Sequence, residues 1–107
     1  MNELHFDQMT HEIHDPDRLA RLVRHCKARM EDFGPGGPQV LAADQGAGRV
    51  TLHFPGQDRD RDRVLSALAR QGIFLAKTED GAAVCLDDGV RFEDLDRLWG
   101  SLFEVLE

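Results

Sequence analysis

The feature that most constrains the fold is the alternation of strand and helix periodicities in residues 49–107. Residues 49–54 alternate strictly, so that Val50, Leu52 and Phe54 fall on one face and polar side chains on the other. A helical pattern, two short apolar segments and a second helical pattern follow. This order predicts strand, helix, strand, strand, helix, with one sheet face packed on the helices.

The segments after this first strand carry their own start and stop signals. The charge-alternating run 58–63 opens a helix, and Gly72 suits the position just past its end. Residues 73–76 and 83–86 are short strands that a tight turn joins. A closing helix follows Gly89, and its apolar stripe consists of Leu95, Leu98, Trp99, Leu102, Phe103 and Leu106.

A further helix begins near Asp15, which can cap free backbone amides, while Pro16 suits a first helical position and Asp17 the positive end of the dipole. The helix ends near Asp32, and Cys26 lies on its apolar stripe. We therefore interpret Cys26 as a core residue and not as a nucleophile. The whole stripe consists of Leu19, Leu22, Val23, Cys26 and Met30.

Residues 39–43 form another strand, which the glycine-containing loop 44–48 connects to the strand at 49–54. The chain is then a single α+β domain over residues 15–107, preceded by an N-terminal arm, residues 1–14. We expect a two-layer sandwich in which a small, mainly antiparallel sheet of about four strands has helices on one face.

The N-terminal arm is ambiguous. Its apolar residues are spaced for either an amphipathic helix or an arm that packs on the domain; they are Leu4, Phe6, Met9 and Ile13. It also carries three histidines, His5, His11 and His14. Their spacing matches no metal-ligand motif, so we interpret the segment as a polar arm and expect no metal site.

Composition excludes several classes of protein. The 107 residues include 20 Asp and Glu against 13 Lys and Arg, and the resulting charge of −7 opposes nucleic-acid binding. No apolar run approaches the ~20 residues that cross a bilayer, and the first residues lack a secretory signal. We expect a cytoplasmic protein. Cys26 and Cys85 match no CxxC spacing and are expected to be free thiols.

Four segments carry a resemblance to a known family: VTLHF at 50–54, ALARQGI at 67–73, AVCL at 83–86 and FEDLDRL at 92–98. In their order and spacing, residues 15–107 resemble the C-terminal small domain of fold-type I enzymes that use pyridoxal phosphate. The pattern is most similar to class V aminotransferases and cysteine desulfurase-like enzymes. The resemblance implies that one face of the sheet would look toward a large domain.

The chain also departs from that family. The resemblance implies an arginine that grips the substrate carboxylate, and the matching position holds Cys85. The residues that hold the cofactor belong to a large domain, which these 107 residues do not contain, and neither Lys27 nor Lys77 lies in a matching context. We therefore expect no bound cofactor and no catalytic residue.

Strand alternation places Thr51, His53, Ala83 and Cys85 on the sheet face opposite the helices. These side chains are small and mildly polar, so they are candidates for a contact surface or a shallow pocket. Cys85 and His53 could be drawn as a thiolate and its base, but no third group orients them, and packing is the stronger interpretation.

Three hypotheses follow. The chain is a non-catalytic interaction or regulatory module that self-associates or docks on a protein through this face. Alternatively, it is a small subunit or regulator that works in trans with a separate pyridoxal phosphate large domain. A third alternative is a small-ligand-binding domain. The missing carboxylate-binding arginine at Cys85 favours the first hypothesis over the second.

Overall fold

A computed structural model describes residues 3–8, 12–34, 36–54, 61–79 and 81–106. Its elements are β1 (Leu4–Phe6), α1 (Pro16–Glu31), β2 (Gln39–Asp44), β3 (Arg49–His53), α2 (Arg61–Arg70), β4 (Ile73–Lys77), β5 (Gly81–Cys85) and α3 (Phe92–Leu106). None of the helices in this part of the chain combines the length and the apolar character that a membrane crossing needs.

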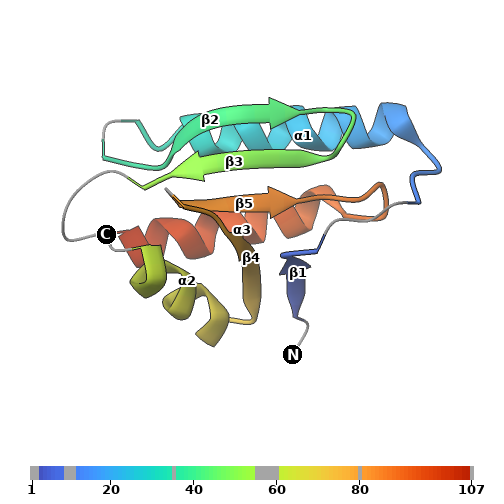
Figure 1. The fold of residues 1–107 in the computed structure, drawn as a ribbon. Coiled ribbons are helices and arrows are strands. Elements are labelled where there is room, and N and C mark those ends of the chain that lie inside the picture. The colour runs from blue at the N-terminus through green and yellow to red at the C-terminus, as the bar shows by residue number, and fades with distance from the viewer. Residues whose placement is uncertain (1–2, 9–11, 35, 55–60, 80, 107) are drawn as a thin grey trace.

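The described strands form one sheet in the order β1-β4-β5-β3-β2, and only the pairing of β1 with β4 is parallel. In Figure 1, α1 and α3 lie behind the sheet, and α2 packs against β4 and α3. The predicted α+β class and mainly antiparallel sheet are confirmed. The sheet has five strands and not four, because residues of the N-terminal arm pair with β4.

The predicted signals for α1 operate as expected. Asp15 is the N-cap, and its carboxylate accepts a hydrogen bond of 3.0 Å from the Arg18 backbone N–H. Pro16 occupies the first helical position, where a missing N–H costs nothing. Cys26 is fully buried on the inner stripe, and burial raises the pKa of its thiol to about 12. The core interpretation of Cys26 is confirmed.

Two glycines allow the strands to approach closely. Gly48 has φ of +70°, and a side chain there would collide with the Leu86 carbonyl oxygen. Its own carbonyl accepts a 2.6 Å hydrogen bond from the Leu86 N–H, which joins the β2–β3 hairpin to the end of β5. Gly81 begins β5 directly against β3, where a side chain would collide with the Leu52 carbonyl oxygen.

The core lies between the sheet and the helices. Val50 pairs with Val84 and Leu52 with Ala82 on the face toward the helices, and all four are fully buried. Phe6 of β1 is 2% exposed and joins this core, while Leu4 and Ile13 pack partly buried against it. Leu4, Phe6 and Ile13 therefore belong to the folded domain. Met9 lies outside the described residues.

The entry to α1 is fastened to the loop that precedes α3. The Asp88 carboxylate accepts hydrogen bonds from the backbone N–H groups of His14 and Asp15. In return the Arg18 guanidinium donates to the Asp88 and Val90 carbonyl oxygens, both at 2.9 Å. These bonds connect residues 70 to 74 positions apart and hold the first turn of α1 against the loop that leads into α3.

Candidate functional site

The sheet face opposite the helices is the candidate site, and we call it the open face. Every second side chain of β3 lies on this face. The face extends across β5 and β4, because Thr51 pairs with Ala83 and Ala83 pairs with Ala76. β1 adds His5 at the edge. The open face thus comprises His5, Arg49, Thr51, His53, Phe74, Ala76, Ala83 and Cys85.

The four residues singled out by alternation lie on this face but differ in accessibility. Thr51 and His53 are partly exposed. Ala83 and Cys85 are buried, with exposed fractions of 0% and 4%. Ala83 lies between Thr51 and Ala76, so the middle of the face carries small side chains. Their role as contact residues stays a prediction.

The strand register separates His53 from Cys85. Cys85 lies opposite Arg49, whereas His53 lies opposite Gly81, four residues further along β3. At roughly 3.3 Å per residue this places the two side chains about 13 Å apart along the strands. A general base must reach its nucleophile within hydrogen-bond distance, so these two residues cannot act as a thiolate–imidazole pair.

The environment of Cys85 also opposes nucleophilic chemistry. Burial is the largest influence and raises the pKa of the Cys85 thiol. The Arg49 guanidinium acts in the opposite direction, and the Asp7 carboxylate raises the pKa further. At neutral pH the side chain is therefore an uncharged thiol that packs in the sheet.

His5 was missed as part of this face because its strand is only three residues long. Its imidazole stacks on the Phe74 ring with a centroid distance of 4.8 Å and an interplanar angle of 8°. Glu3 and Asp7 lie 3.5 and 3.6 Å from its two ring nitrogens. The alternation of Leu4, His5 and Phe6 was the available signal, but three residues are too few to identify a strand.

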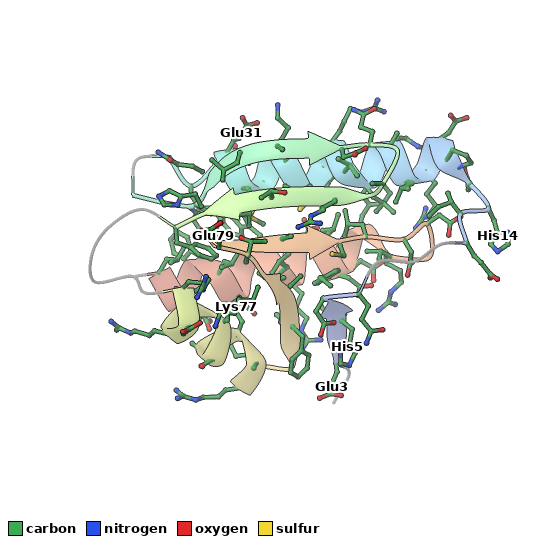
Figure 2. The ribbon with its side chains drawn as sticks, viewed as in Figure 1. Glu3, His5, His14, Glu31, Lys77 and Glu79 are labelled. Atoms are coloured by element: carbon green, nitrogen blue, oxygen red, sulfur yellow. The ribbon has the colours of Figure 1, made fainter. Side chains whose placement is uncertain are left out.

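The histidines of the N-terminal segment do not converge. Figure 2 shows His5 beside Glu3 in the lower part of the view and His14 apart from them at the right-hand end, where the chain enters α1. His11 lies outside the described residues. In the part of the chain that the structure describes, no group of three or more His, Cys, Asp or Glu side chains could hold a metal ion.

The open face combines a small, uncharged middle with a polar margin. Thr51, Ala76 and Ala83 form the middle, while Arg49 and His5 stand at the margin and are exposed. Protein–protein interfaces commonly have this arrangement, with a core depleted of charge and a polar rim. The arrangement provides contact area, and of the candidate pair on the described part of this face, His53 and Cys85 do not converge.

Comparison with known proteins finds similarity at the level of structure alone. No protein-family model and no curated protein matches the chain. Among solved structures, the chain is similar to a transaminase studied by directed evolution and ancestral reconstruction, with a TM-score of 0.63 and 15% identity. The match covers 83% of this chain and 22% of the transaminase. The fold of this chain therefore corresponds to a part of that transaminase that makes up about one fifth of its length.

Proposed function

We propose that this chain is a non-catalytic interaction module with the fold of an aminotransferase small domain, and that another protein docks on its open face. The observation that carries this proposal is the uncharged middle of a sheet face that no described helix covers. The class V similarity that the sequence suggests is part of the proposal, since the structural neighbour supports only the coarser assignment.

The composition of the open face supports docking. An antiparallel sheet can face water on one side, but its outer residues are then usually polar or charged. Here Ala76 and Thr51 are partly exposed, and Phe74 presents a ring beside them. Covering these side chains with a partner would remove apolar surface from water at ~25 cal/mol per Å².

The same residues support a role without catalysis. Cys85 is a buried thiol, and His53 lies about 13 Å from it along the strands. The two lysines do not fit the role of a pyridoxal phosphate anchor. Lys27 lies 3.7 Å from Glu31 and Lys77 lies 3.0 Å from Asp62, and about half of each lysine side chain is exposed.

A second candidate function is a subunit that works in trans with a separate large domain. The match to 22% of a transaminase chain supports it, because the match leaves most of the transaminase architecture unaccounted for. Under this hypothesis the partner of the open face is a transaminase-like large domain. The two candidates share the surface and differ in the partner.

Photo-crosslinking tests the proposal. A photoreactive amino acid at Thr51 is expected to capture a defined partner in the source cells, because Thr51 lies at the middle of the open face. The matched control carries it at Arg21, an exposed residue of α1 on the other layer. Ala76→Glu should abolish capture from position 51, since it places a charge in the uncharged middle.

The outcomes separate the alternatives. Capture of a transaminase-like chain would support the trans subunit, and capture of another protein would support the interaction module. Equal capture from positions 51 and 21, or no capture from either, would contradict docking on the open face.

A further inference from the structure

The second notable surface is the outer edge of β2. Every residue of this strand except Val40 is exposed, and Leu41 is 54% exposed. Residues 39–43 read QVLAA and carry no charge, and Asp44 supplies the first one at the end of the strand. In the sheet order β2 is an end strand, so β3 is its one sheet neighbour among the described residues.

The two edges of the sheet are protected to different degrees. An unpaired strand edge presents backbone N–H and C=O groups to other chains, and proteins usually guard it with charge, short length or a bulge. β1 is three residues long and holds His5 between Glu3 and Asp7. β2 is six residues long, and its protection is a shift in register between Val40 and Ala42.

We infer that β2 pairs with β2 of a second copy of this chain, antiparallel and about a two-fold axis. Such a contact is isologous, so the backbone N–H groups at the edge of one copy meet the backbone C=O groups at the same edge of the other copy. Charge permits this partner. Each copy carries a net charge of −7, which opposes association in general, but residues 39–43 carry no charge, so two copies can meet there without placing like charges against each other.

The contact also buries the most exposed large apolar side chain of the described residues, Leu41. One pair of six-residue strands is smaller than a standard interface of ~1,600 Å². The dimer is therefore in equilibrium with the monomer and grows with concentration. This inference does not depend on the open face, which stays uncovered in both copies when the edges pair.

Sedimentation velocity on the full chain over a wide concentration range tests the inference. Wild-type protein is expected to shift from monomer to dimer as concentration rises. Leu41→Lys should weaken the dimer by roughly tenfold or more, because it removes an apolar contact and puts a cation in each edge. The matched control is Phe103→Lys, since Phe103 is 45% exposed on α3, which is not a strand of the sheet, and the dimer should be unchanged.

Hydrogen exchange at low and high protein concentration locates the contact even if one variant folds poorly. Amides of residues 39–44 are expected to gain protection with concentration, and those of α3 should not. A chain that stays monomeric throughout overturns the inference. So does a dimer that Phe103→Lys disrupts, or one whose protection falls on the open face. Because Leu41→Lys leaves Thr51 untouched, a failure here is distinguishable from a failure of the crosslinking experiment.

Discussion

Gly81 and Gly100 occupy positions that tolerate a side chain very differently. A Cβ at Gly81 would collide with the backbone of β3, whereas a Cβ at Gly100, inside α3, would meet no atom within 4 Å beyond its chain neighbours and the nearby helix backbone. We expect Gly81→Ala to lower the free energy of unfolding by roughly 1–3 kcal/mol. Gly100→Ala should raise it by about 0.5–1 kcal/mol, because alanine favours a helix. Urea denaturation measures both, and equal shifts would contradict this account.

Leu86 distinguishes the two faces of the sheet at the level of one residue. It is 2% exposed and belongs to the core between sheet and helices. Leu86→Asp buries a charge without a partner, which should unfold the domain, since total stabilities are only about 5–15 kcal/mol. Thr51→Asp on the open face should keep the native circular dichroism spectrum. A folded Leu86→Asp variant would mean that the core is misassigned.

At the scale of elements, the hydrogen bonds between the Asp88 carboxylate and the start of α1 predict that the stability of the fold is sensitive to acid. Hydrogen bonds from the backbone N–H groups of Asp15 and His14 hold the pKa of the Asp88 carboxyl below its usual value. A lowered pKa in the folded state contributes stability above the unfolded value of ~3.9 and loses it as pH falls further.

The melting temperature should therefore decline below about pH 4, and Asp88→Asn, which does not titrate, should make that decline shallower. Thermal melts from pH 7 to pH 2.5 provide the measurement. An acid limb of the same slope in both proteins would show that Asp88 does not contribute to it.

The N-terminal segment is an element of the sheet, and its removal is expected to be costly. Deleting residues 1–13 removes β1 with Phe6, which is 2% exposed, and the partly buried Leu4 and Ile13. Each such side chain contributes roughly 1.5–3 kcal/mol before ordering costs, so the deletion should lose a few kcal/mol. An unchanged melting temperature would contradict this expectation. Zinc should have no effect on either protein.

Local signals explain which elements could be predicted. Asp15 and Pro16 identify the start of α1 through capping, and Gly72, with φ of +79°, closes α2 as expected. β1 could not be predicted, because it depends on parallel pairing with β4, about 70 residues away along the chain. A three-residue segment is too short to carry a sequence pattern that would indicate pairing with such a distant strand.

At the scale of the whole molecule, the sequence predicts on which face of the sheet the candidate residues lie, but not how far apart they lie on that face. Alternation alone assigned Thr51, His53, Ala83 and Cys85 to one face, because successive side chains of a strand point to opposite faces of the sheet. How far along that face each residue lies depends on the register between β3 and β5. The separation of His53 from Cys85 therefore required the structure.

The whole chain is expected to form no specific adduct with pyridoxal phosphate. Both lysines are exposed and lie near carboxylates, so neither has the desolvated setting that makes a lysine amine reactive. Borohydride reduction followed by peptide mapping should show only scattered, substoichiometric labelling, and Lys77→Ala should not change its total extent appreciably. A stoichiometric adduct at one lysine would disprove the prediction.

The placement of the described helices on a single layer determines what pairing through β2 would present to a partner. A two-fold axis perpendicular to the sheet leaves both helical layers on one side and both open faces on the other. A partner that is itself dimeric could then engage two sites at once, and its second contact would form at an effective concentration of about millimolar. Weak docking on each face would add up to avidity, which Leu41→Lys would reduce by weakening the dimer without altering either face.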